Sequence, residues 1–205
     1  MSSVMEREAE YARDGYTYAD YLEWDENLRA EIIDGELFAL AAPDLEHQRI
    51  IRQLLLALGN FLKGKPCEVF AAPVSVRLNP AQDNGDKTVL EPDIVVVCDP
   101  AKLDKRGVNG APDLVIEVLS PSTARHDKLV KFHKYRAAGV REYWLVDPDA
   151  QIVQVCILTD GWYKISAYGE TDSTDGTILP VSVLPGCKID LKDISRRTTS
   201  SPSPF

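Results

Sequence analysis

The apolar positions of this chain follow two different periods, and each period predicts a different kind of element. Between Asp44 and Gly64 the apolar residues recur at helical spacing, which predicts a helix that Asp44 opens and Gly64 ends. Two later runs, residues 89–97 and 113–119, are apolar at most positions and show no helical period. Runs of that length predict buried strands, so the core is expected to combine a long amphipathic helix with strands.

Turn residues predict most of the remaining elements. Asp34-Gly35 favours a two-residue turn, so residues 29–40 are predicted to form a hairpin. A second hairpin is predicted over residues 152–168, around Asp160-Gly161. The other predicted elements are a short helix over residues 17–24, strands over 68–78 and 142–146, and a helix that Ser122 or Thr123 caps and Gly139 ends.

Length and charge narrow the class of protein. A chain of 205 residues without an internal linker predicts a single domain, here residues 16–195. Residues 1–15 are expected to be mobile, and residues 196–205 are expected to be a disordered tail because they hold few apolar side chains. The net charge of −9 argues against a general polyanion binder, although a local basic face remains compatible with it.

Cysteine spacing and hydropathy indicate the compartment. The four cysteines are scattered and form no Cys-x-x-Cys pair, which argues against a zinc site or a redox motif. Cys98 and Cys156 lie in or beside apolar strands, so both are predicted to be buried reduced thiols. Neither a signal core nor a stretch of membrane-spanning length is found, and a cytoplasmic protein without membrane contact is expected.

Glu117 gives the clearest indication of chemistry. It lies inside the apolar run 114–119, where an ionised carboxylate is costly unless positive charge meets it. The sequence Pro112-Asp113 at the start of this strand repeats the earlier Pro92-Asp93, so two neighbouring strands each deliver an acid. Asp93 and Glu117 are therefore predicted to share a Mg²⁺ or Mn²⁺ ion. The alternatives are a buried salt bridge from Glu117 to an arginine and a turn or cap role for Asp93.

The helix after this strand carries a polar stripe. Asp127, Lys131 and Tyr135 recur at intervals of four, so they share one helical face. The helix begins near the end of the Glu117 strand, and Lys131 is predicted to reach the carboxylates across apolar surface. A solvated charged face is the alternative. Apolar residues on another part of the helix are predicted to meet the sheet: Leu129, Val130 and Ala137.

Two further polar residues have open interpretations. Glu31 sits in the apolar context Ala30-Glu31-Ile32-Ile33, and it is either a third acid near the site or an ordinary edge-strand glutamate. His47 lies in the first turns of the long helix. Because no partner spacing argues for a metal ligand, a satisfied or exposed histidine is the simpler interpretation.

Together these segments resemble the Uma-two family of endonucleases, a branch of the PD-(D/E)XK nuclease superfamily. The resemblance runs from about Glu31 to Pro148. It rests on residues 31–37, His47, Glu91-Pro92-Asp93-Ile94, residues 112–123, Asp127, Lys131, Tyr135, Gly139-Val140 and residues 142–148. The resemblance implies an α/β fold with a restriction-endonuclease-like core, in which helices flank a mixed central β-sheet. The two predicted hairpins would be additions at the N- and C-terminal ends.

The resemblance also assigns roles. Asp93 matches the first acid of the superfamily motif and Glu117 the second, while Leu119 stands where the motif has its lysine. The family's lysine is relocated to the following helix, which points to Lys131 first and Lys128 second. The implied activity is hydrolysis of DNA phosphodiester bonds assisted by Mg²⁺ or Mn²⁺. The residues expected to support Asp93, Glu117 and Lys131 are Glu31, His47, Asp127, Lys128 and Tyr135.

Two classes of function stay open at this point. The first is a metal-dependent DNA endonuclease, for which cutting both strands of a duplex would require a homodimer. The second is a non-catalytic module that keeps the nuclease fold for binding or assembly. Asp93, Glu117 and Lys131 favour the enzyme, whereas Leu119 and the negative charge favour the module.

Overall fold

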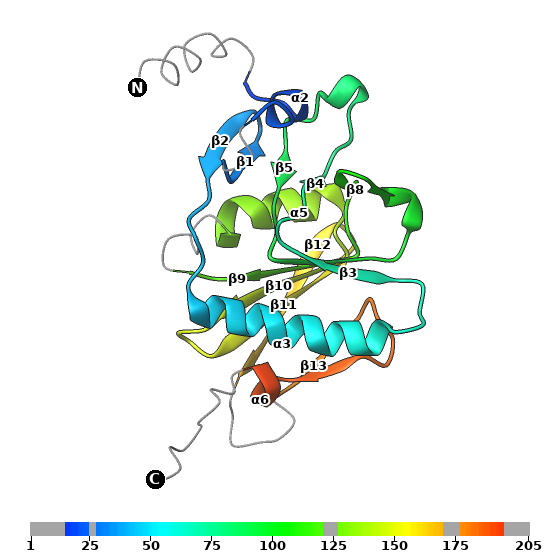
Figure 1. Ribbon diagram of the computed structural model, residues 1–205. Helices are drawn as coiled ribbons and strands as arrows, with labels where there is room; N and C mark the ends of the chain where they lie inside the picture. The colour runs from blue at the N-terminus through cyan, green and yellow to red at the C-terminus, as the bar shows by residue number, and fades with distance from the viewer. Residues whose placement is uncertain (1–14, 25–27, 121–126, 170–176, 195–205) are drawn as a thin grey trace, which may run out of the picture.

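Two six-stranded sheets organise the chain in the computed structural model, which describes residues 15–24, 28–120, 127–169 and 177–194 (Figure 1). In spatial order the central sheet contains β12 (Trp162–Gly169), β11 (Ile152–Thr159), β10 (Glu142–Asp147), β9 (Leu114–Val118), β6 (Ile94–Val97) and β3 (Glu68–Ala71). The second sheet contains β2 (Glu36–Ala39), β1 (Ala30–Ile33), β5 (Val89–Leu90), β4 (Val76–Arg77), β8 (Gly107–Asn109) and β7 (Leu103–Asp104).

The helices and a small hairpin complete the described elements. The helices are α2 (Tyr18–Tyr21), α3 (Leu45–Leu62), α5 (Phe132–Ala138) and α6 (Leu191–Ile194), with the π-helical turn η3 (Asp127–Lys131) and the 3-10 turns η1 (Gln82–Asn84) and η2 (Pro100–Lys102). The hairpin pairs β13 (Ile178–Pro180) with β14 (Lys188–Asp190). No described helix has both the length and the apolar content that crossing a membrane requires.

The central sheet is mixed and deeply buried. β9 pairs with β10 in parallel, and every other pairing in this sheet is antiparallel. All residues of β6 and β9 are buried, which agrees with their Val- and Ile-rich sequences, because strands covered on both faces lose the alternation of apolar and polar residues. Glu117 therefore lies at the centre of the fold, on a strand that is covered on both faces.

Helices cover both faces of this sheet. On one face, α3 packs Leu54 and Leu58 into a cluster with Ile116 and Trp144. On the opposite face, Tyr135 of α5 packs with Tyr143. Figure 1 shows the sheet between these two helices. The predicted α/β fold with a mixed central sheet flanked by helices is confirmed.

Local signals predicted the turns and caps correctly. The Asp44 carboxylate accepts a hydrogen bond from His47 N at 2.8 Å and caps α3. Asp34 and Gly35 have φ values of 53° and 85°, as a primed turn requires, and they connect β1 to β2. Gly139 ends α5 in the left-handed conformation. The predicted cap at Ser122 or Thr123 lies outside the described residues, as do nearly all of residues 1–15 and the whole of residues 196–205.

The predicted strands over residues 68–78 and 89–97 were wrong in one respect, because each is two strands in different sheets. β5 pairs in the second sheet and β6 in the central sheet, so the chain crosses between sheets at Glu91-Pro92-Asp93. Pro92 lacks the N–H that a continuous ladder would use. Residues 68–78 divide in the same way into β3 and β4, with Pro73 in the connection.

The cysteine prediction was correct for Cys156 and wrong for Cys98. Cys67 and Cys98 form a disulfide, because the antiparallel pairing of β3 with β6 brings the flanking residues together. Cys156 and Cys187 are buried free thiols. Burial raises the pKa of Cys156 to about 12, so this thiol stays protonated at neutral pH.

Candidate active site

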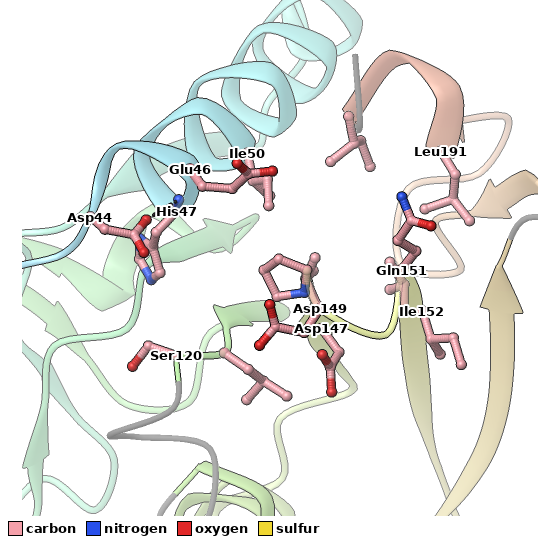
Figure 2. Close-up of a pocket in the computed structure, with 15 residues that line it drawn as sticks. Asp44, Glu46, His47, Ile50, Ser120, Asp147, Asp149, Gln151, Ile152 and Leu191 are labelled. Carbon is pink, nitrogen blue, oxygen red and sulfur yellow. Dashed lines mark hydrogen bonds between the residues drawn. The ribbon is translucent and has the colours of Figure 1, made fainter. Parts of the chain in front are cut away.

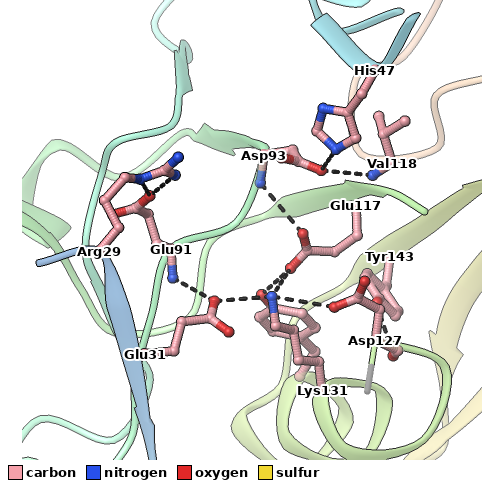
Figure 3. Close-up of polar contacts among 11 residues, drawn as sticks. Arg29, Glu31, His47, Glu91, Asp93, Glu117, Val118, Asp127, Lys131 and Tyr143 are labelled. Atoms are coloured by element: carbon pink, nitrogen blue, oxygen red, sulfur yellow. Dashed lines mark hydrogen bonds and ion pairs between the residues drawn. The ribbon is translucent and has the colours of Figure 1, made fainter. Parts of the chain in front are cut away.

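A buried lysine joins three carboxylates from three different elements. Lys131 Nζ lies 2.9 Å from Glu31 Oε1, 3.0 Å from Glu117 Oε1 and 3.3 Å from Asp127 Oδ1 (Figure 3). Glu31 comes from β1 and Glu117 from β9, while Asp127 lies one turn before Lys131 in η3. Its ammonium donates a hydrogen bond to Glu117 and forms ion pairs with all three acids.

The polar stripe along η3 and α5, which the sequence predicted as one helix, is therefore buried. Asp127, Lys131 and Tyr135 are buried, whereas Leu129 is 53% exposed and Val130 is 37% exposed. Ala137 is exposed as well. The prediction that Leu129, Val130 and Ala137 meet the sheet was wrong. The carboxylates of Glu31 and Glu117 reverse the usual polarity of the helix, because they stabilise an ammonium inside the fold.

The charges in this cluster do not balance. Burial raises the pKa of Glu117 well above its usual value; Lys131 opposes this effect, while Asp127, Asp93 and Glu31 add to it. Burial acts to lower the pKa of Lys131, but Glu117, Glu31 and Asp127 raise it well above its usual value. Three acidic side chains thus share one protonated amine, and a further cation beside them would relieve the repulsion that helps to raise the pKa of Glu117.

Tyr135 fixes the same oxygen of Glu117 that Lys131 holds. Its hydroxyl donates to Glu117 Oε1 at 2.8 Å. Burial, followed by the charges of Glu117 and Glu31, raises the pKa of Tyr135 well above its usual value, so the hydroxyl keeps its proton. Glu117 Oε1 is thereby held by two donors. Glu117 Oε2 accepts only a longer bond, of 3.4 Å, from Asp93 N.

Asp93, which directly precedes β6, lies opposite Glu117 of the neighbouring strand β9. The register pairs Ile94 with Ile116, so the next pair toward the site is Asp93 with Glu117. Directly opposed residues of an antiparallel pair lie on the same face. Asp93 Oδ2 accepts a hydrogen bond from Val118 N at 2.8 Å. The structure therefore brings together the two acids that the sequence singled out. The salt-bridge alternative for Glu117 is also realised, with a lysine as its partner.

His47 completes the surroundings of Asp93. Its Nε2 lies 3.1 Å from Asp93 Oδ2. Burial acts to lower the pKa of His47, but the hydrogen bond and charge of Asp93, together with the Val118 backbone, raise it overall. The sequence offered no partner for this histidine. Its partner comes from a strand 46 positions away in the chain, which only the tertiary structure reveals.

Lys128 lies apart from the cluster. Its Nζ contacts Asp147 Oδ2 at 3.2 Å, near the surface. Residues that sequence reasoning gave no role are Arg29 and Glu91. Arg29 Nε donates to Glu91 Oε1 at 3.1 Å, and Glu91 N donates to Glu31 Oε1 at 2.8 Å. Arg29 and Glu31 are two positions apart on one strand face, which is the only signal that could have linked this arginine to the site.

A cavity of about 280 Å³ opens beside these groups and includes Asp93, Glu117, Asp127 and Lys131 in its lining. Among the described residues no three His, Cys, Asp or Glu side chains form a complete metal cage. Glu31 Oε2 is buried and has no hydrogen-bond partner within the described chain. An excess of acidic groups over amines, an all-oxygen donor pair and an orphaned carboxylate oxygen fit a hard divalent cation whose coordination waters and substrate phosphate would complete.

Comparison with known proteins identifies the family of the chain. The sequence profile of the Uma2 family, described as "Putative restriction endonuclease", matches residues 18–192. In Synechocystis sp., "Uncharacterized protein slr1290" is 28% identical over 162 residues, covering 78% of this chain and 77% of the relative. "Uncharacterized protein sll1609" of the same organism is 27% identical over 154 residues, covering 73% and 81%.

A solved structure supports the fold. The crystal structure of a "putative nuclease belonging to DUF820" from Anabaena variabilis superposes with a TM-score of 0.69. It shares 23% sequence identity, and the match covers 88% of this chain and 97% of that chain. The two proteins therefore share their fold over most of this chain.

Proposed function

The chain belongs to the Uma2 family, and we propose that it is a metal-dependent endonuclease that hydrolyses phosphodiester bonds in DNA. The observation that carries this proposal is the opposition of Asp93 and Glu117 across β6 and β9, beside the ammonium of Lys131. Two acids and a lysine at one cavity supply the charges that phosphodiester hydrolysis needs.

Asp93 and Glu117 would hold a Mg²⁺ or Mn²⁺ ion. When bound, such an ion lowers the pKa of a coordinated water and neutralises charge on the phosphate. Val118 N and His47 both contact Asp93 Oδ2, which leaves Oδ1 as the oxygen for an ion. Lys131 and Tyr135 both contact Glu117 Oε1, which leaves Oε2, with its longer bond from Asp93 N, for the same purpose. The two carboxylates are thus oriented by the protein before an ion arrives.

Lys131 has two tasks in this proposal. It forms ion pairs with three acidic side chains, and through its hydrogen bond to Glu117 it positions that carboxylate and stabilises its charge. Its contact with Asp127 is the longest of the three, at 3.3 Å, and is the one that a substrate phosphate oxygen would replace. Lys131 would then stabilise the charge that develops on the phosphate in the transition state.

A second candidate function is a binding module that keeps the fold without catalysis. Leu119 favours it, because this residue is buried and apolar where the superfamily motif has a lysine. The two functions differ in one measurable property, since only the enzyme requires a divalent ion for strand cleavage.

Nicking of supercoiled plasmid DNA tests the proposal. Cleavage is expected with Mg²⁺ or Mn²⁺, and it should be abolished by EDTA and by Asp93→Asn. Asp113→Asn is the matched control, because Asp113 follows a proline in the same way, but its carboxylate binds Cys98 N and Arg141 instead of lining the cavity. Absence of cleavage in the unaltered protein with either ion, or equal cleavage in the presence of EDTA, would contradict the proposed enzyme.

A further inference from the structure

Two larger grooves adjoin the catalytic cavity. One has a volume of about 640 Å³ and shares Asp44, His47 and Ser120 with that cavity. The other has a volume of about 590 Å³ and shares Arg29, Pro43 and Asp93 with it. We refer to them as the acidic groove and the arginine groove. Both grooves are therefore candidate paths for a substrate strand that places a phosphate in the cavity.

The sheet order separates the two grooves. The acidic groove is lined by Val146 at the end of β10 and by Ile152 and Val153 of β11. The arginine groove is lined by Ala71 at the end of β3. β9, which carries Glu117, and β6, which directly follows Asp93, lie between these strands. The grooves therefore flank the catalytic cavity on opposite sides.

Helix α3 separates them in the same way. Glu46, His47 and Ile50 line the acidic groove, whereas Gln48, Ile51, Arg52, Leu55 and Leu56 line the arginine groove. At about 100° per residue, these two sets project from nearly opposite sides of the helix. The N-terminal half of α3 thus forms a wall with one kind of surface on each side.

The charges on the two sides have opposite sign. The acidic groove is lined by four carboxylates, those of Asp44, Glu46, Asp147 and Asp149 (Figure 2). Of these, Asp147 is already paired with Lys128. A phosphate chain laid along this groove would meet like charge. The negative lining therefore disfavours the phosphodiester backbone on the β10–β11 side of the cavity.

The arginine groove presents the complementary surface. Among the described residues its lining contains Arg52 and Arg29, whose guanidinium also contacts Glu91, and Asp93 at the cavity is the only acid in that lining. The remainder is largely apolar and includes Leu56, which is 54% exposed. Arginine presents its donors in a planar fork that matches phosphate oxygens. Two arginines above an apolar floor suit phosphates on one side and the sugars and bases of the same strand on the other.

We propose that the arginine groove binds the phosphodiester backbone of the substrate strand immediately next to the scissile phosphate. Arg29 would contact the phosphate nearest the cavity, because it lines both surfaces. Arg52 would contact a phosphate further along the strand. This assignment rests on the proposed nuclease function and adds to it the path of the strand. It also explains how a chain with a net charge of −9 approaches a polyanion.

Arg52→Gln tests this path, and Arg49→Gln is its matched control. Both residues are exposed on α3 and each change removes one positive charge, but Arg49 lines neither groove. The probe is a fluorescein-labelled DNA oligonucleotide of about 30 nucleotides. Ca²⁺ replaces Mg²⁺ so that binding is measured without cleavage. Fluorescence anisotropy over a range of salt concentrations measures Kd. Arg52→Gln should weaken binding about tenfold and reduce the salt slope by about one phosphate contact.

The outcomes separate this inference from the proposed function. Arg49→Gln should weaken binding less than Arg52→Gln does, since Arg49 lines neither groove and contributes only through the general field of its charge. If the two changes weaken binding equally, or if Arg52→Gln has no effect, in a protein that still nicks plasmid DNA, the arginine groove does not bind the strand. The proposed nuclease function would not be contradicted by that result. A protein that neither binds the oligonucleotide nor cleaves plasmid DNA would overturn both.

Discussion

Lys131 Nζ lies 3.0 Å from Glu117 Oε1, and both side chains are almost completely buried. Removing one partner of a buried ion pair is strongly destabilising, because the other charge stays behind without compensation. The two partners are not equivalent here, since Lys131 is one cation among three carboxylates. The structure therefore predicts losses of stability of very different size for substitutions at the two positions.

Lys131→Met should lower the free energy of unfolding by about 3–5 kcal/mol, because three buried carboxylates lose their counter-charge. Lys128→Met is the control. Its ammonium pairs with Asp147 near the surface, so a change below about 1 kcal/mol is expected. Urea denaturation in the presence of EDTA measures both. A Lys131→Met protein as stable as the unaltered chain would contradict the buried ion cluster.

Glu117→Gln should cost less than about 1 kcal/mol in the same experiment. The amide oxygen can still accept from Lys131 and Tyr135, and the repulsion from Asp127, Asp93 and Glu31 is removed. Its affinity for Mn²⁺ should nevertheless fall, because the proposed metal ligand loses its charge. Loss of several kcal/mol would instead show that Glu117 is retained for stability.

His47→Ala should weaken binding of Mn²⁺ by about 10- to 100-fold, because the imidazole orients the Asp93 carboxylate. His133→Ala is the matched control, since His133 is exposed on α5. Isothermal titration calorimetry measures both affinities. If the two variants bind Mn²⁺ equally well, the contact between His47 and Asp93 has no part in preparing the site.

The disulfide predicts a definite pattern of thiol labelling. Of the four cysteines, Cys67 and Cys98 are bonded and the other two are buried, so the folded protein should react slowly with a maleimide at pH 7. In denaturant two thiols should react, and after reduction all four should. Mass spectrometry counts the added groups. Four labels in denaturant without a reductant would show that Cys67 and Cys98 are reduced and would contradict the disulfide.

Local patterns were sufficient for the features that depend on neighbouring residues. The turn at Asp34-Gly35, the Asp44 cap and the unusual acid at Glu117 could all be recognised from the sequence. Features that depend on distant segments could not. The crossing between sheets near Pro92 places Glu31 beside Lys131, and no periodicity in the chain encodes that approach.

The buried face of η3 and α5 illustrates the same limit. Hydrophobicity favoured Leu129 and Val130 as its contacts with the sheet, yet both are exposed. Lys131 is buried instead, because Glu31 and Glu117 arrive from two separate strands to compensate its charge. Hydropathy ranks side chains by their average cost of burial, and that ranking fails where the tertiary structure supplies a specific partner.

The most direct test of the account is the location of a metal ion. Crystals grown or soaked with Mn²⁺ and measured for anomalous scattering would show it. The account predicts one strong peak between the carboxylates of Asp93 and Glu117, with Mn–O distances near 2.2 Å, about those of a hard divalent ion, and no such peak in crystals of Asp93→Asn. A structure with Mn²⁺ bound elsewhere, or with the Asp93 and Glu117 carboxylates free of metal at saturating Mn²⁺, would contradict it.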